Sequence, residues 1–136
     1  MALQFAPKMG TIVLVDFDKG FMPPEMVKPR LAVVISPPIK ARGKLLTVVP
    51  LSTTAPDKIM PYHCQIDIPF ELPPRWGNVA RWVKGDMINS VSFARTSLLA
   101  LGKDAQGQRV YQTNPLQAEQ LALIQRCVLA GLGLGS

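Results

Sequence analysis

The basic residues of the sequence are concentrated in one segment. Between Lys19 and Lys44 there are six basic residues and one acidic residue, Glu25, so this segment carries +5 of the formal net charge of +6. The basic residues are Lys19, Lys28, Arg30, Lys40, Arg42 and Lys44. A concentrated positive segment is typical of a polyanion site, although a run of charge can also be only a solvated face. Arg30 closes the basic loop and opens the predicted strand that follows it. A guanidinium fixed at the start of a strand could bind a phosphate group in bidentate fashion.

A second constellation that could do chemistry is the pair Lys84 and Asp86. The two residues are two positions apart on a predicted strand, so we expect their side chains on the same face. A cation and a carboxylate on one face can act as general acid or charge stabiliser and as general base, or they can form a structural salt bridge. His63 is the only histidine of the sequence, which excludes a two-histidine nuclease centre and a histidine-rich metal site.

The composition is that of a globular, rather apolar chain. Of the 136 residues 48% are apolar and 18% are charged, and the mean hydropathy is +0.18. This length predicts one domain, residues 1–136. Cys64 and Cys127 are far apart and form no CxxC pattern, which argues against a disulfide framework or a thiolate zinc site and favours a reducing compartment. Neither a signal peptide nor a membrane-spanning run is present, so we expect a cytoplasmic protein.

Short, β-branched apolar runs separated by proline pairs predict strands. These strands cover residues 11–17, 31–36, 45–49, 62–68, 78–83, 86–93 and 98–101. Turns are expected at Gly77 and over residues 103–107. Short strands at regular spacing predict a mainly β fold, a small antiparallel barrel or sandwich over about residues 9–110.

One helix is predicted after the strands, over about residues 115–130. Asn114 can cap its free N–H groups, Pro115 fits the first helical position, and Gln117 completes a capping box. Apolar residues then recur at helical spacing, and Gly131 ends the helix. These apolar residues are Leu121, Ile124 and Val128. We expect this face to pack on the barrel, with a dimer or partner interface as the alternative.

Three segments of the sequence, residues 9–18, 30–37 and 49–53, can be compared with known families. In order and spacing they resemble the PemK/MazF toxin family. The resemblance runs from about Met9 to Thr54 and again around Asp86 to Val91, about half of the chain. It implies an SH3-like antiparallel β-barrel of the CcdB/Kid/MazF type with a C-terminal α-helix, in a homodimer. It also implies the toxin of a type II toxin–antitoxin pair, which an antitoxin protein neutralises. The family's reaction is cleavage of single-stranded RNA, without metal or other cofactor, to a 2′,3′-cyclic phosphate and a 5′-hydroxyl.

The resemblance carries catalytic roles to Arg30 and Ser52. Arg30 matches the arginine of the family's R-P-x-V-x-S motif and would stabilise charge on the scissile phosphate. Here Pro29 precedes the arginine and Leu31 follows it, so Lys28 is the alternative for this role. Ser52 takes the place of the first hydroxyl of the family's Thr/Ser pair, where it could donate to a phosphate oxygen or orient the attacking 2′-OH.

Lys84 and Asp86 align with an Arg-x-Asp pair of the family, for which acid and base roles have been proposed. Met87 and Asn89 stand where the family has glutamine and a basic residue. RNA contacts are expected from Lys19, Lys28, Thr53 and His63. For the histidine, a solvated or satisfied core position is the alternative, and for Ser52 and Thr53 it is an ordinary turn.

Three aromatic side chains could stack unpaired bases: Tyr62, Trp76 and Trp82. By its strand position we expect Trp82 in the core instead. The segment from Ile68 to Trp76, which contains three prolines, looks like an insertion relative to compact toxins and resembles the longer, YifN-like members of the family.

Two other functions fit parts of the sequence. The first is a catalytically weakened module that binds RNA or a protein without cutting, because of Leu31, Met87 and Asn89. The second is inhibition of DNA gyrase, as in the related CcdB toxins, but the C-terminus has Gly-Leu repeats without the expected aromatic residue. The retained Arg30, Ser52 and Asp86 favour the enzyme over the binding module.

Overall fold

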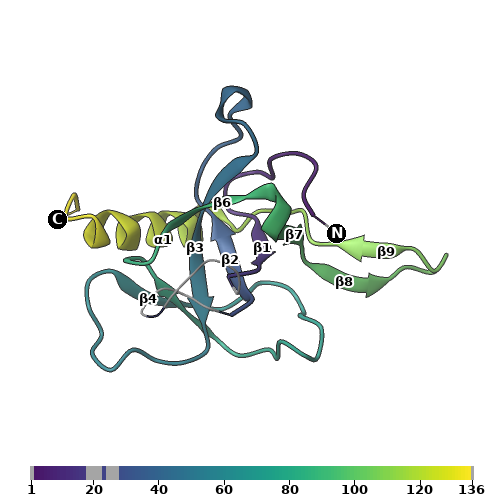
Figure 1. Ribbon diagram of the computed structural model, residues 1–136. Coiled ribbons are helices and arrows are strands. Elements are labelled where there is room, and N and C mark those ends of the chain that lie inside the picture. Colours follow the sequence, from purple (N-terminus) through teal and green to yellow (C-terminus); the bar gives the residue numbers. More distant parts are fainter. Residues whose placement is uncertain (1, 18–22, 24–27, 136) are drawn as a thin grey trace.

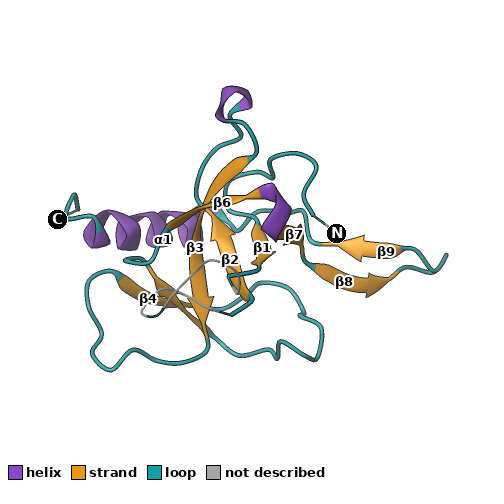
Figure 2. Cartoon of the chain, in the orientation of Figure 1, coloured by secondary structure: helices purple, strands orange, loops and turns teal. Residues whose placement is uncertain are grey.

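The part of the chain that the computed structural model describes, residues 2–17, 23 and 28–135, forms nine strands, two 3₁₀ turns and one helix (Figures 1 and 2). The strands are β1 (Ile12–Val15), β2 (Arg30–Val34), β3 (Leu45–Ser52), β4 (His63–Ile66), β5 (Arg81–Lys84), β6 (Asn89–Ser92), β7 (Thr96–Leu98), β8 (Ala100–Lys103) and β9 (Arg109–Tyr111). The 3₁₀ turns are Lys40–Arg42 and Phe93–Arg95, and the helix α1 spans Ala118–Gly131. Lys19, one of the predicted RNA contacts, lies outside the described residues.

The sheet is organised around β3. The first residues of this strand pair with β6, its middle pairs with β2, and its last two residues pair with β5. β2 also pairs with β1, and β1 pairs with β7, whereas β5 also pairs with β4. All these pairs are antiparallel. An eight-residue strand that changes partner along its length must bend, and the bend curls the seven-stranded sheet into a barrel (Figure 1). The predicted mainly β barrel with a C-terminal helix is confirmed.

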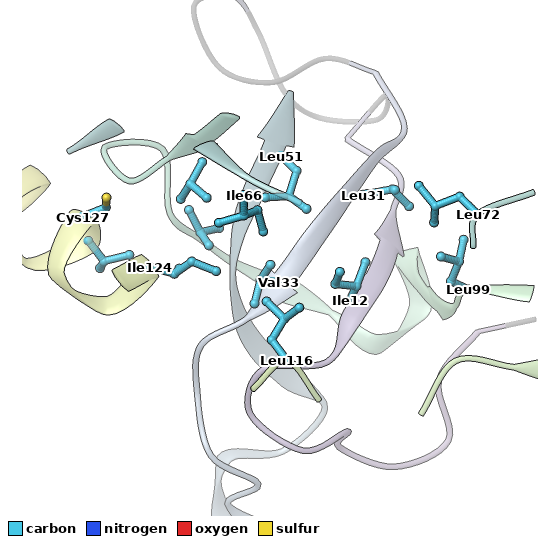
Figure 3. Close-up of a cluster of buried hydrophobic side chains, with 13 residues drawn as sticks. Ile12, Leu31, Val33, Leu51, Ile66, Leu72, Leu99, Leu116, Ile124 and Cys127 are labelled. Carbon is cyan, nitrogen blue, oxygen red and sulfur yellow. The ribbon is translucent and has the colours of Figure 1, made fainter. Parts of the chain in front are cut away.

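Alternate residues of the central strands point into two apolar clusters. In β2, Leu31 and Val33 belong to one cluster, whereas Ala32 and Val34 belong to the other. The first cluster, here called the helix-side core, consists of Ile12, Leu31, Val33, Val49, Leu51, Ile66, Leu72, Val83, Leu99, Leu116, Ile124, Cys127 and Val128 (Figure 3). The second core consists of Val13, Val15, Phe17, Ala32, Val34, Leu46, Val48, Val91 and Phe93. Because both faces of β2 are buried, its sequence is a continuous apolar run.

Helix α1 packs on the barrel through the apolar face that the sequence predicts. Ile124, Cys127 and Val128 are buried in the helix-side core, and the helix contacts β4 and β5. Both cysteines are free; burial, together with the neighbouring Cys127 thiol, raises the pKa of the Cys64 thiol to about 12. Within the described residues, α1 lacks the length and the apolar character that a membrane-spanning helix requires.

The helix can approach β5 closely because Gly85 has no side chain. A Cβ at this position would lie 2.6 Å from the carbonyl oxygen of Cys127 and 2.6 Å from that of Tyr62. Backbone atoms on both sides leave the added carbon no room to move, so the helix or the turn after β5 would have to shift.

We therefore expect Gly85→Ala to lower the free energy of unfolding by about 1–3 kcal/mol, the usual cost of overpacking a close contact. Urea denaturation followed by tryptophan fluorescence measures this. Gly107→Ala is the control, because no atom lies within 4 Å of the added Cβ and only its backbone, with φ of +78°, is strained. An equal loss in both variants would contradict the close approach of the helix.

The helix begins later than predicted. Gln117, not Asn114, is the N-cap, and its side chain makes no capping hydrogen bond. The residues before it are held by other parts of the chain: the Leu116 N–H donates to the carbonyl oxygen of Gly10 at 2.9 Å, and the Leu116 side chain is buried in the helix-side core. This tertiary contact holds Leu116 outside the helix and overrides the local capping signal.

The predicted strand over residues 98–101 is in fact divided between two strands. β7 ends at Leu98 and pairs with β1, whereas β8 begins at Ala100 and forms a separate two-stranded sheet with β9, which the sequence analysis missed. The buried Leu99 lies between them. The predicted turn is confirmed, since the Gly107 N–H donates to the carbonyl oxygen of Asp104 at 3.0 Å. The hairpin extends from the barrel on the side away from α1 (Figure 1).

Candidate functional site

Polar residues gather on one face of the sheet where its strands end. The β3–β5 register pairs Ser52 with Trp82. The β2–β3 register pairs Ala32 with Pro50, and continued by two residues it places Arg30 opposite Ser52. Because cross-strand partners share a face, Arg30, Ser52 and Trp82 form one row across three strands.

A second row lies beside the first. Lys84 is two residues beyond Trp82 on β5, and its partner on β4 is His63. Trp82 and Lys84 are half-buried, whereas Arg81 and Val83 take the inward positions of the strand and are buried. The prediction that Trp82 belongs to the core is therefore wrong, because strand alternation turns it to the polar face.

Lys84 and Asp86 were expected on one strand, and this prediction is wrong. β5 ends at Lys84, and Asp86 lies in a turn closed by a hydrogen bond from the Met87 N–H to the Lys84 carbonyl oxygen at 3.0 Å. The close contact of Gly85 with the helix makes the chain turn here. Lys84 and Asp86 nevertheless both act electrostatically on His63, so the three residues form one cluster.

The imidazole of His63 is oriented by its own loop. Its Nδ1 accepts a hydrogen bond from the Met60 N–H at 3.1 Å, so the neutral ring carries its proton on Nε2. The Tyr62 ring packs against it edge to face with centroids 4.6 Å apart. Burial lowers the pKa of His63 below the ordinary 6.5, and the charge of Lys84 lowers it further, while Asp86 acts in the opposite direction. At neutral pH His63 is thus a neutral hydrogen-bond donor.

The titration of His63 provides a test of this cluster. We expect the imidazole resonance to titrate with a midpoint below 6.5, to move up in Lys84→Met and to move down in Asp86→Asn. Since the folded pKa is below the unfolded one, the free energy of unfolding should fall as the pH drops through about 6.5. NMR of the single histidine measures the midpoint, and a downward shift in Lys84→Met would contradict the arrangement.

Arg30 lines a hollow of about 190 Å³, here called the Arg30 hollow. Its lining residues are Pro29, Arg30, Leu31, Leu51, Thr53, Arg75, Trp76 and Arg81. The Nε atom of Arg30 is buried and has no hydrogen-bond partner among the described residues. Leaving a buried donor unpaired costs about 1–3 kcal/mol, and such groups call for a functional explanation. A phosphate in the hollow would lie against the Arg30 side chain.

The two hydroxyls after β3 differ in their surroundings. Ser52 is buried, and its hydroxyl accepts a hydrogen bond from the Thr54 N–H at 3.1 Å, a local turn contact. Thr53 is exposed and lines the Arg30 hollow. The structure thus brings Thr53 into the hollow beside Arg30, while Ser52 is next to Arg30 in the sheet register.

Arg81 is a part of the site that sequence reasoning missed. This buried guanidinium lines the Arg30 hollow and donates to the carbonyl oxygens of Trp76, Gly77 and Val79, the last at 2.8 Å. Burial lowers its pKa, but a guanidinium remains charged in proteins. The sequence contained one signal for this role, since Arg81 takes an inward position of a predicted strand. A buried arginine needs several hydrogen-bond acceptors around it, which the loop before the strand would have to supply.

Of the remaining predicted contacts, Lys28 is exposed, two residues before Arg30. Among the described residues, no three His, Cys, Asp or Glu side chains come together as a group that could hold a metal ion. The candidate site therefore has two parts, the Arg30 hollow and the cluster of His63, Lys84 and Asp86.

Comparison with known proteins identifies the family. Residues 8–129 match the family described as the PemK-like, MazF-like toxin of type II toxin–antitoxin systems. The Escherichia coli K12 protein YifN is 32% identical, over 97% of this chain and 95% of its own. Deinococcus radiodurans MazF shares the fold with a TM-score of 0.64 at 21% identity, covering 96% of this chain and 99% of that one. An endoribonuclease from a mycobacterial species, solved with its cognate antitoxin, has a TM-score of 0.57 at 15% identity, covering 96% of this chain and 99% of that one. The resemblance seen in the sequence is confirmed, and the chain belongs to the PemK/MazF family of toxins.

Proposed function

We propose that this toxin is an endoribonuclease that cleaves single-stranded RNA without a metal ion. The observation that carries the proposal is Arg30, whose buried Nε has no partner among the described residues and which lines an open hollow with Thr53. A guanidinium held in this way is preorganised for the negative charge that develops on a phosphate during transfer. The RNA itself supplies the nucleophile, so no activated protein nucleophile is required.

The proposed reaction is a transesterification within the RNA. The 2′-oxygen attacks the adjacent phosphorus while the bond from phosphorus to the 5′-oxygen breaks, which leaves a 2′,3′-cyclic phosphate and a 5′-hydroxyl. Asp86 takes the proton of the 2′-hydroxyl, and the Lys84 ammonium gives a proton to the departing 5′-oxygen. Arg30 stabilises the charge on the phosphate, with Ser52 and Thr53 as hydroxyl donors to its oxygens.

His63 serves this reaction as an RNA contact. Its Nδ1 is engaged by the Met60 N–H, so the neutral ring offers only Nε2–H as a donor. A lowered pKa keeps the ring in this form near neutral pH. Its role is therefore to donate a hydrogen bond to RNA beside Lys84, with Lys28 as a further phosphate contact.

The test is an analysis of reaction products. The purified protein is incubated with a mixed-sequence single-stranded RNA in excess EDTA, and the ends of the fragments are identified by mass spectrometry. The proposal predicts 2′,3′-cyclic phosphate and 5′-hydroxyl ends. Fragments with 5′-phosphate ends, or cleavage that appears only after Mg²⁺ is added, would contradict it.

The second candidate function is RNA or protein binding without cleavage. It is favoured by Asn89, which stands where the family has a basic residue and whose Nδ2 donates to the Met87 carbonyl oxygen at 3.1 Å. The Ser52 hydroxyl is likewise engaged locally. Intact RNA that nonetheless shifts on a gel would identify this function.

We further propose a cognate antitoxin and a homodimer, in the cytoplasm. An acidic or amphipathic antitoxin segment would cover the same positive face and inhibit by occupying it. Light scattering of the purified toxin measures the oligomeric state, and a monomer at micromolar concentration would contradict the dimer.

A further inference from the structure

The loop between β4 and β5 holds Arg75 and Trp76 in a fixed backbone. The Trp76 N–H donates to the Pro73 carbonyl oxygen at 2.9 Å, and the Leu72 N–H donates to Asn78 Oδ1 at 3.1 Å. Leu72 is buried in the helix-side core, beside Leu99 in Figure 3, and Trp76 packs against the same core. Arg81 completes this anchoring, because its guanidinium donates hydrogen bonds to three carbonyl oxygens of the loop.

Within this loop the Arg75 guanidinium lies over the Trp76 ring. The central carbon of the Arg75 guanidinium lies 4.6 Å from the centroid of the Trp76 ring. Arg75 is exposed, whereas Trp76 is half-buried. A guanidinium that rests on an aromatic ring is held flat by it and presents its other face outward. The pair therefore offers a guanidinium backed by an aromatic ring, on a loop that several hydrogen bonds hold in place.

Arg75 stands where three hollows meet. It lines the Arg30 hollow of about 190 Å³, a second hollow of about 370 Å³ and a third of about 480 Å³. Trp76 lines the first and the third. The two larger hollows fall in the range of about 300–1,000 Å³ that small-molecule sites occupy, so each has room for a nucleotide beside the Arg30 hollow.

The charge of these hollows suits a polyanion. Arg30 and Arg81 line the first hollow, Arg95 lines the second and Arg109 lines the third. Asp16, in the second hollow, is the acidic residue among their lining residues. A positive groove combined with a stacking surface is how proteins bind single-stranded nucleic acid.

We propose that Arg75 and Trp76 form a base-stacking platform, on which a nucleotide next to the scissile phosphate rests when that phosphate occupies the Arg30 hollow. The base stacks on the free face of the Arg75 guanidinium, as unpaired RNA bases do on arginine planes. The inference rests on the proposed RNA substrate but concerns binding and register, not the chemical step. The platform makes this loop a determinant of which bond is cut.

The test measures binding to an RNA that cannot be cleaved. A short oligonucleotide with 2′-O-methyl groups throughout is titrated with wild type, Arg75→Ala and Arg75→Lys, and Kd is obtained from fluorescence anisotropy. The series is repeated with a single abasic nucleotide moved along the strand. Arg126→Ala, an exposed arginine on α1, is the charge-matched control.

We expect Arg75→Ala to weaken binding by about 5- to 100-fold, the range for one lost base stack. Arg75→Lys should lose most of the same affinity, because an ammonium keeps the charge but not the plane. At one position along the strand, an abasic nucleotide should weaken the binding of the RNA to the wild type. The same abasic RNA should bind to Arg75→Ala no more weakly than the intact RNA does. The proposal is overturned if Arg75→Lys binds like wild type, or if every abasic position costs both proteins the same. Because the readout is binding, the result is independent of whether the RNA is cut.

Discussion

Replacing Arg30 with alanine is expected to lower the rate of RNA cleavage by about 100- to 1,000-fold, the usual effect of removing one preorganised donor from a developing oxyanion. The fold should remain intact, because the Nε of Arg30 has no partner within the described residues and its removal leaves no acceptor unpaired there. Single-turnover cleavage of a fluorescent RNA measures the rate, and urea denaturation measures the stability.

Three further variants separate the phosphate grip from general charge. Arg30→Lys should recover only a small part of the activity, because an ammonium cannot make the bidentate contact. Lys28→Ala should weaken RNA binding a few-fold, as expected for an exposed phosphate contact, and Arg126→Ala should behave like wild type. If the cleavage rate falls more in Lys28→Ala than in Arg30→Ala, then Lys28 and not Arg30 has the catalytic role.

The largest effect on stability is expected for Arg81→Met, which should lower the free energy of unfolding by about 3 kcal/mol. The methionine fills most of the space but leaves the carbonyl oxygens of Trp76, Gly77 and Val79 without their charged donor. Hydrogen bonds to charged groups contribute about 1.5–3 kcal/mol, and unpaired buried acceptors add a further cost. Urea denaturation of the purified variant measures the change.

The neighbouring Arg75→Ala provides the matched control for this experiment. It removes the same charge six positions earlier, but Arg75 is exposed and its contact with Trp76 is worth about 0.5–1 kcal/mol. Proteolysis of the Arg81→Met variant should begin in residues 67–80, because the loop loses its anchor. Wild-type stability in Arg81→Met would mean that the loop is held by its turns and by Leu72 alone.

Local patterns predicted the barrel well where both faces of a strand are buried. The run around Val33 and the run around Val48 are continuous and β-branched, and the pair Pro37-Pro38 separates them, so the strands could be read from the sequence. β9 could not, because Val110 is exposed and the strand pairs only with its neighbour in a hairpin. An exposed three-residue strand has no burial pattern to reveal it.

The start of the helix and the shared strand of Lys84 and Asp86 were predicted wrongly for a tertiary reason. The helix starts after Leu116 because this residue is buried in the core and bound to Gly10, a contact between distant parts of the sequence. β5 ends at Lys84 because Gly85 must fit against the helix. Neither contact leaves a local signal.

The site was predictable where it follows a motif and not where it depends on the loop. Arg30 and Thr53 line the same hollow, as their shared family segment suggested, and Lys84 lies beside His63 through strand register. Arg75 and Arg81 were missed as site residues, since what brings them to Arg30 is the folded path of residues 67–80.

The most direct test of the central claim compares two RNAs of one sequence, one with all its 2′-hydroxyls and one with 2′-O-methyl groups, incubated with wild type and with Arg30→Ala in excess EDTA. If Arg30 stabilises the phosphate and the 2′-oxygen is the nucleophile, only wild type cuts at an appreciable rate, and it cuts only the RNA with free 2′-hydroxyls. Cleavage of the 2′-O-methyl RNA, or equal cleavage by Arg30→Ala, would contradict it.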